Sequence, residues 1–434
     1  MFSAAILSLC LAYLMLRPVS NNEILLPVLA VMGIVAACVA LSRGTGISGQ
    51  LVPVAVPIFT VGALGSVVGA GNPGFFYGVL VWLAAPLLYW AWVAALGAEF
   101  MPIILRTCAW ATILLSTAIV LYVASQLGMI PAVLPEALLV SSGAGFEGEL
   151  GDTAIRLYGL STLVAAAPMW VTALFVRSHP WLPAKWICAL AAASATSASL
   201  IAGRRAVVLV LVVIPVVALI VKFLARDRSK VVKVSPVVVL TGLAGIVIVA
   251  LNWVAITSNT ALRDTFAGFA DLLNGGTETA SEGVRAEQIS RLVEYGGRSP
   301  IWGHGFGSVI NGYSRNELRP WTFEMQYHLL YMQVGLIGLA LVAIALIAAL
   351  MAFYRATQKR PDLLPVLTVT AAAALAILIA NYTNPYLQAP GHMWAVYLVL
   401  AVINVALVES PPSTSMRKAA RKGDLSLRAK RARA

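Results

Sequence analysis

Two side chains capable of acid–base chemistry stand four residues apart where the sequence turns from polar to apolar. They are Glu324 and His328, in the stretch WTFEMQYHLLYMQVGLIGL. On a helix that begins there, a spacing of four places both side chains on one face. A carboxylate beside an imidazole can take a proton from a hydroxyl, one group acting as base while the other orients it. The alternative is an acid favoured by the helix N-terminus and a hydrogen-bonded interfacial histidine.

Arginine is the second residue type with chemical potential. The segment 256–325 contains no lysine and six arginines, namely Arg263, Arg285, Arg291, Arg298, Arg315 and Arg319. Guanidinium groups bind phosphate and carboxylate through paired hydrogen bonds. The segment therefore indicates an anion site, and the alternative is pairing with its own acids. These are Asp264, Asp271, Glu278, Glu282, Glu287, Glu294, Glu317 and Glu324.

Arg204 and Arg205 lie elsewhere, in SLIAGRRAVVLVL between two apolar segments that offer no acid. Charge at membrane depth is costly and marks a functional site. The N-terminus of the following helix would add affinity for anions. The alternative is that these arginines reach out to lipid phosphates.

Metal and nucleotide motifs do not occur in the sequence. It contains no HExxH, no DxD, no histidine pair at ligand spacing and no Walker loop. Its four cysteines, Cys10, Cys38, Cys108 and Cys188, are scattered through apolar runs without CxxC spacing. They are interpreted as small core residues rather than metal or redox ligands. The sequence predicts neither a metal site nor a cofactor.

These residues must be positioned by membrane helices. Hydrophobic residues make up 60% of the chain and charged residues 11%, with a mean hydropathy of +0.87. Long apolar runs predict an all-α polytopic membrane protein, because a spanning helix satisfies its own backbone hydrogen bonds. The predicted spans are 2–16, 23–41, 51–69, 75–97, 101–127, 156–176, 185–203, 205–222, 234–255, 326–353, 362–381 and 391–408.

The lysines predict the orientation of these twelve spans. All eight, Lys185, Lys222, Lys230, Lys233, Lys359, Lys418, Lys422 and Lys430, fall in every second connection or after residue 408. Lysine marks cytoplasmic connections, so both termini are expected in the cytoplasm. Residues 1–408 are expected to form one domain with outside connections at 128–155 and 256–325, the second a large helical loop between the ninth and tenth spans. The basic tail 409–434 is expected to be disordered and to contact anionic lipids rather than nucleic acid.

Three stretches together resemble the superfamily of O-antigen ligases and Wzy-type polymerases, membrane glycosyltransferases of bacterial surface polysaccharide. They are AGRRAVVL, the run from Arg285 through RLVEYGGRSPIWGHGFGSV, and YHLLYMQVGLIGL. Ligases of this family carry a histidine about eleven residues before the first glycine of the Gly-Leu-Ile-Gly element. Counting back eleven from Gly335 gives Glu324, while Tyr327 matches the family's aromatic residue. This departure favours a polymerase over a ligase.

The resemblance implies transfer of a glycan from undecaprenyl pyrophosphate to a sugar hydroxyl at the periplasmic face of the bacterial inner membrane. Arg204, Arg205, Arg285 and Arg291 would hold the pyrophosphate, and Glu324 or His328 would be the base, without a metal. Implied partners are the lipid-linked glycan, membrane lipids and a chain-length regulator. Two alternatives are a ligase acting on lipid A core and a transporter or flippase of lipid-linked sugars.

Overall fold

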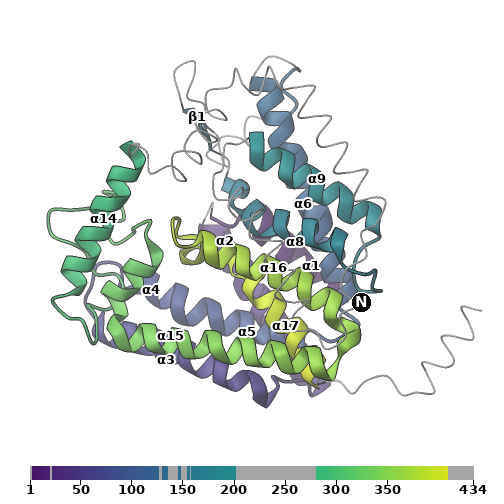
Figure 1. Ribbon diagram of the computed structural model, residues 1–434, viewed down its shortest axis with the longest axis horizontal. Helices are drawn as coiled ribbons and strands as arrows, with labels where there is room; N and C mark the ends of the chain where they lie inside the picture. The colour runs from purple at the N-terminus through teal and green to yellow at the C-terminus, as the bar shows by residue number, and fades with distance from the viewer. Residues whose placement is uncertain are drawn as a thin grey trace, which may run out of the picture.

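The computed structural model describes residues 2–19, 22–126, 130–134, 145–147, 154–156, 158–201 and 280–408. Within these ranges the protein is built from helices, as predicted (Figure 1). Two short strands, β1 (Gly145–Glu147) and β2 (Ala154–Arg156), are the exception. They pair antiparallel with Phe146 opposite Ile155, and β2 extends from the predicted 128–155 connection into the first residue of the predicted span 156–176.

Except for α14 (Ala280–Gly296), which lies in the polar segment 256–325, the helices follow the apolar runs closely. They are α1 (Phe2–Leu16), α2 (Asn22–Arg43), α3 (Val52–Val68), α4 (Phe75–Val79), α5 (Ala85–Ala95), α6 (Met101–Gln126), α8 (Leu163–Phe175), α9 (Lys185–Ile201), α14 (Ala280–Gly296), α15 (Gln326–Lys359), α16 (Leu364–Ala380) and α17 (Trp394–Val408). A π-helical turn, Leu80–Ala84, joins α4 to α5. Short 3-10 turns precede α3, α8, α16 and α17.

Seven of the described helical stretches are long and apolar enough to cross a membrane. They are Glu23–Arg43, Gly49–Val68, Phe75–Ala95, Met101–Ser125, Gln326–Lys359, Pro361–Ala380 and Pro390–Val408. Phe2–Leu16 and Gly159–Phe175 are apolar but shorter. The protein is therefore helical and suited to a membrane. The predicted spans 205–222 and 234–255 and the tail 409–434 lie outside the described residues, so the number twelve stays a prediction.

One end of the bundle gathers the connections that carry the described lysines. Arg43, at the end of α2, forms an ion pair with Glu99 in the connection before α6. The backbone N–H of Ser48 donates to the side chain of Asn404 in α17 at 2.8 Å. Lys359, at the end of α15, donates to a backbone carbonyl in the last turn of α17. The ends of α2, α15 and α17 thus lie together.

The other end gathers the remaining connections. Thr162, before α8, donates to the carbonyl of Met15 at the end of α1 at 2.6 Å. Asn72, between α3 and α4, donates to the carbonyls of His304 and Phe306 at 2.9 and 3.0 Å. The orientation of the described helices relative to a membrane stays a prediction.

Helix α15, which packs along α3 (Figure 1), is broken at Gly335. The backbone of this residue has φ 60° and ψ −165°, so hydrogen-bonding groups on both sides of the break lose their helical partners. Residues 300–307, PIWGHGFG, supply replacements and are called the Gly-rich segment below. The N–H of Gly305 donates to the carbonyl of Gln333 at 2.8 Å, and the N–H of Leu336 donates to the carbonyl of Pro300 at 2.8 Å. Satisfying these groups matters because unpaired backbone is costly inside a membrane.

The Gly-rich segment also joins α15 to α3 and to the turn between α3 and α4. The N–H of Phe306 donates to the carbonyl of Gly65 at 2.8 Å, and the N–H of Gly74 donates to the carbonyl of Gly307 at 3.1 Å. The Phe306 ring is fully buried and stacks on Trp82 with ring centroids 5.6 Å apart. The Gly-rich segment therefore has a structural role, because it holds the first part of α15 against α3 and α4.

Candidate functional site

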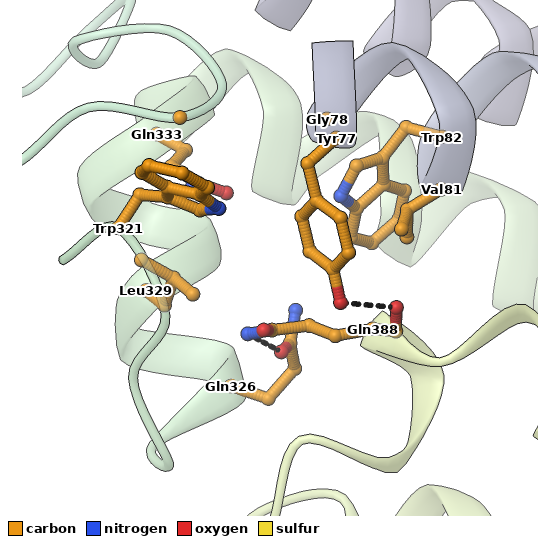
Figure 2. Close-up of a pocket in the computed structure, with 10 residues that line it drawn as sticks. Tyr77, Gly78, Val81, Trp82, Trp321, Gln326, Leu329, Gln333 and Gln388 are labelled. Carbon is orange, nitrogen blue, oxygen red and sulfur yellow. Dashed lines mark hydrogen bonds between the residues drawn. The ribbon is translucent and has the colours of Figure 1, made fainter. Parts of the chain in front are cut away.

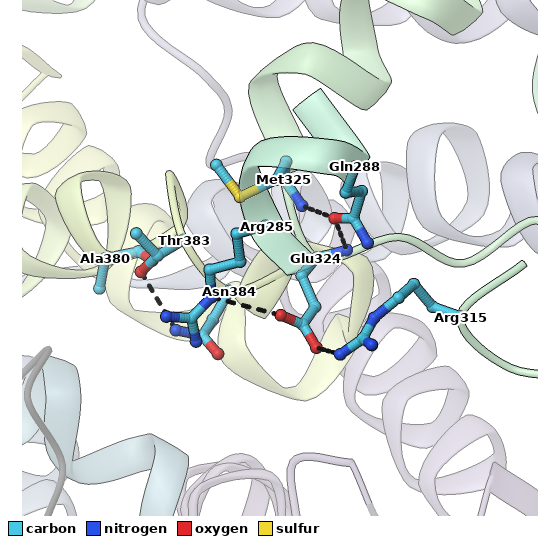
Figure 3. A network of polar contacts seen from close by, with 8 residues as sticks. All are labelled: Arg285, Gln288, Arg315, Glu324, Met325, Ala380, Thr383 and Asn384. Carbon is cyan, nitrogen blue, oxygen red and sulfur yellow. Dashed lines mark hydrogen bonds and ion pairs between the residues drawn. The ribbon is translucent and has the colours of Figure 1, made fainter. Parts of the chain in front are cut away.

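The carboxylate of Glu324 lies between two guanidinium groups (Figure 3). Its Oε1 accepts a hydrogen bond from Nη2 of Arg315 at 2.7 Å, and its Oε2 lies 3.5 Å from Nε of Arg285. All three side chains are about one-third exposed. Ion pairs at such exposure contribute little to stability, so an incoming anion can replace the carboxylate. The cluster has one negative and two positive charges, which leaves it net positive.

Helix α14 presents Arg285 to this cluster. Arg285 and Gln288 are three residues apart and share the face of α14 that packs against the start of α15. Leu292 of the same helix is fully buried in a small apolar cluster with Phe323 and Met332. This packing fixes the position of Arg285 relative to Glu324.

Two glutamines hold the backbone on either side of Glu324. Gln288 is fully buried, and its Oε1 accepts hydrogen bonds from the N–H groups of Glu324 and Met325, both at 2.9 Å. Gln388, between α16 and α17, donates from Nε2 to the carbonyl of Phe323 at 3.3 Å. Because N–H groups at a helix start lack intrahelical acceptors, Gln288 acts as a cap supplied by a different helix.

Replacing Gln288 by leucine is expected to lower the free energy of unfolding by about 1–3 kcal/mol, because two buried N–H groups lose their acceptor. The measurement is thermal unfolding of the purified protein in detergent. Glu287→Leu is the matched control on the same helix, since Glu287 is exposed and pairs only loosely with Arg291 at 3.6 Å. Equal melting temperatures for the two variants would contradict the capping role.

The end of α16 forms a further side of the site. Figure 3 shows Thr383 and Asn384 beside Arg285, with Nδ2 of Asn384 donating to Oγ1 of Thr383 at 3.1 Å. The ring of Tyr382 lies 5.8 Å from that of His328, which agrees with this placement. Neutral hydroxyl and amide groups thus border the charged cluster.

The expected stacking of Glu324 and His328 on one helix face is wrong. Helix α15 begins at Gln326, and Met325, with ψ 76°, turns the chain away from the helical path. Glu324 therefore precedes the helix and points to the arginines. His328 lies in the first turns of α15, and its Nδ1 is buried with no hydrogen-bond partner within the described residues.

Arg291, expected to bind pyrophosphate, contacts other groups in the structure. It pairs with Glu287 at 3.6 Å, and its guanidinium lies 6.0 Å from the ring centroid of Tyr313. Burial, followed by the charge of Glu287, raises the pKa of the Tyr313 hydroxyl, which therefore stays protonated at neutral pH. Arg298 similarly pairs with Glu294 at 3.1 Å. Arg285 and Arg315 pair with Glu324, another acid of 256–325, so for all four arginines the alternative of pairing within the segment describes the observed contacts.

The remaining expected site residues, Arg204 and Arg205, lie outside the described residues. The structure adds Arg315 as the closest partner of Glu324, and Gln288 and Gln388 as its supports. In the sequence, Arg315 is one of six arginines in the segment 256–325, and no spacing distinguishes it from the others. The glutamines are neutral and carry no sequence signal of their own.

Among the described residues, no three His, Cys, Asp or Glu side chains lie close enough together to hold a metal ion. In comparisons with known proteins, no family model and no curated protein matches this chain. What the arrangement can do chemically follows from its groups. Two guanidiniums can bind a phosphate-like anion, and a carboxylate released from them can accept a proton.

Proposed function

We propose that this protein is a polymerase of lipid-linked polysaccharide repeat units, a metal-independent glycosyltransferase of the bacterial inner membrane. It would transfer a glycan from undecaprenyl pyrophosphate to a sugar hydroxyl at the periplasmic face. The observation that carries the proposal is the Glu324 carboxylate held between Arg285 and Arg315. In this proposal the chain spans the membrane twelve times with both termini in the cytoplasm.

The location of the cluster supports this orientation. It lies at the start of α15, whereas Lys359 lies at the end of the same helix. Lys185 donates to the carbonyls of Ala173 and Val176, at the end of α8, at 2.5 and 2.6 Å. Lysine at helix C-termini suits both the helix dipole and a cytoplasmic face. The opposite end, with Glu324, would then face the periplasm.

In the proposed chemistry the cluster first binds an anion and then accepts a proton. Pyrophosphate would take over Arg285 and Arg315, with Arg291, Arg204 and Arg205 as further proposed contacts. The freed Glu324 carboxylate would accept the proton of the acceptor hydroxyl. The hydroxyl oxygen would then bond to the anomeric carbon of the donor sugar as the bond between that carbon and the pyrophosphate oxygen breaks. Each donor placed on the developing charge is worth roughly 3–4 kcal/mol. His328 is the alternative base.

Two other functions use similar features. A ligase would share this machinery and differ in its acceptor, lipid A core. A transporter or flippase would be expected to place its charges near the bilayer midplane. The ionic cluster Arg285–Arg315–Glu324 lies instead at one end of the described bundle, which favours chemistry at the membrane surface. Undecaprenyl-linked glycan, membrane lipids and a chain-length regulator are the proposed partners.

The test is complementation of a host strain from which this gene is deleted. Wild type, Arg285→Ala and Arg298→Ala are expressed at equal membrane levels, and the surface polysaccharide is separated on a gel. Arg298 is the matched control, because it is an exposed arginine paired with Glu294 rather than Glu324. A polymerase predicts single repeat units on the lipid core in the deletion strain and in Arg285→Ala, and long chains in Arg298→Ala.

Other patterns on the gel would overturn the proposal. Long chains that accumulate unattached on the lipid carrier in the deletion strain would make the protein a ligase. Absence of glycan from the outer face would make it a transporter. Full restoration of long chains by Arg285→Ala would mean that Arg285 is not required for the reaction.

A further inference from the structure

A small cavity lies beside the backbone that carries Glu324. It is lined by Tyr77, Gly78, Val81, Trp82, Gly307, Trp321, Gln326, Leu329, Gln333 and Gln388 (Figure 2). Its volume is about 20 Å³, which is room for a water-sized group or slightly more. None of the lining residues carries a formal charge at neutral pH. The cavity therefore suits a small, uncharged group.

Two buried N–H donors in this lining have no hydrogen-bond partner within the described residues. They are Nε2 of Gln326 and Nε1 of Trp321. Figure 2 shows both nitrogens directed toward the space in front of Tyr77. Gln326 is only 2% exposed, so solvent does not compensate its amide. Unsatisfied buried donors are costly, and their convergence on one cavity indicates a bound acceptor.

The orientation of the Gln326 amide follows from its neighbours. Gln388 donates from Nε2 to the carbonyl of Phe323 at 3.3 Å, a bond that only its NH₂ group can make. The same Nε2 lies 2.6 Å from Gln326, so the Gln326 atom facing it is the acceptor Oε1. The NH₂ group of Gln326 is thereby directed into the cavity.

A ligand that fits this cavity offers an acceptor oxygen to two N–H donors and is uncharged. The aromatic faces of Trp82 and Trp321 and the apolar Val81 and Leu329 would contact carbon atoms attached to it. A hydroxyl or hydroxymethyl arm of a sugar has this combination of oxygen, size and carbon. A single water also supplies an oxygen but leaves the apolar wall without a contact.

We infer that this cavity is a binding subsite for a hydroxyl-bearing arm of one sugar unit of the glycan. The kind of ligand rests on the proposed function. Gln326 is two residues from Glu324, and Gln388 contacts both the cavity and the Glu324 backbone segment through Phe323. A sugar anchored here would lie next to the backbone that carries Glu324, which makes Gln326 a residue that positions substrate.

The test measures binding without turnover. The full-length protein in lipid nanodiscs is titrated by calorimetry with the repeat-unit oligosaccharide released from the host's own surface polysaccharide. We expect saturable binding to wild type and at least about fivefold weaker binding to Gln326→Met, which keeps length but lacks the donor. Trp321→Phe removes the second donor and is expected to weaken binding similarly. Trp302→Phe is the matched control, because Trp302 is exposed and does not line the cavity.

Equal affinity of wild type, Gln326→Met and Trp321→Phe would overturn the inference and mean that the cavity holds only water. Absence of saturable binding to wild type would overturn it as well. Because binding requires no reaction, its outcome is separate from that of the gel assay. A ligase or transporter result on the gel together with weakened binding to Gln326→Met would leave the subsite intact while the polymerase proposal fails.

Discussion

Replacing Glu324 by glutamine is expected to lower the rate of chain extension by at least about 10²-fold while the protein stays folded. Glutamine has nearly the same size and can still accept a hydrogen bond from Arg315, which lies at 2.7 Å in the wild type. Glutamine cannot, however, accept the proton of the acceptor sugar hydroxyl in the proposed reaction. The measurement is the rate at which purified protein extends lipid-linked repeat units, followed on a gel.

The control for this prediction is Glu317→Gln. Glu317 is an exposed acid of the same connection, between Arg315 and Arg319, so the change removes an equal charge. Wild-type extension by Glu317→Gln and loss in Glu324→Gln would assign the effect to the base. If Glu324→Gln extends chains normally and His328→Gln does not, the base is His328 instead.

Replacing Gly305 by alanine is expected to destabilise the protein by about 2–5 kcal/mol. The residue has φ 79°, which costs roughly 1–2 kcal/mol for a residue with a side chain. A Cβ atom there would also lie 2.0 Å from the backbone nitrogen of Gly69, and displacing packed backbone adds roughly 1–3 kcal/mol. Thermal unfolding and protease resistance in detergent measure the loss.

Gly312 offers a matched control for this glycine. Its φ is 74°, similar to that of Gly305, but nothing lies within 4 Å of an added Cβ. Gly312→Ala therefore carries the conformational cost alone, about 1–2 kcal/mol. If both alanine variants unfold at the same temperature, the close approach of the Gly-rich segment to the α3–α4 turn contributes nothing to stability.

Hydrophobic runs predicted the described helices other than α14, because a membrane helix must satisfy its backbone hydrogen bonds within one apolar stretch. The spans 101–127 and 362–381 correspond to α6 and α16 within a few residues. Predicted to end at residue 353, α15 continues to Lys359. The added turn is amphipathic rather than apolar, and the helix ends just before Pro361, where proline disfavours continuation.

The site was less predictable, because its contacts join residues that share no periodicity. Glu324 and Arg285 could be singled out by residue type, yet their pairing depends on how α14 packs against α15. Gln388 comes from the connection before the last helix, and no local pattern links it to Phe323. The break at Gly335 is not evident from the sequence either, since the two glycines of this apolar run, Gly335 and Gly338, are compatible with a continuous helix.

The contact between Tyr77 and the carbonyl of Gln388 spans 311 residues of sequence. Because Gln388 also holds the backbone before Glu324, the site draws on early and late parts of the chain. During synthesis, the first helices enter the membrane long before their partners exist. Assembly of the site is thus one of the last steps of biogenesis, and a chain truncated before Gln388 is expected to be inactive even though it carries Arg285, Arg315 and Glu324.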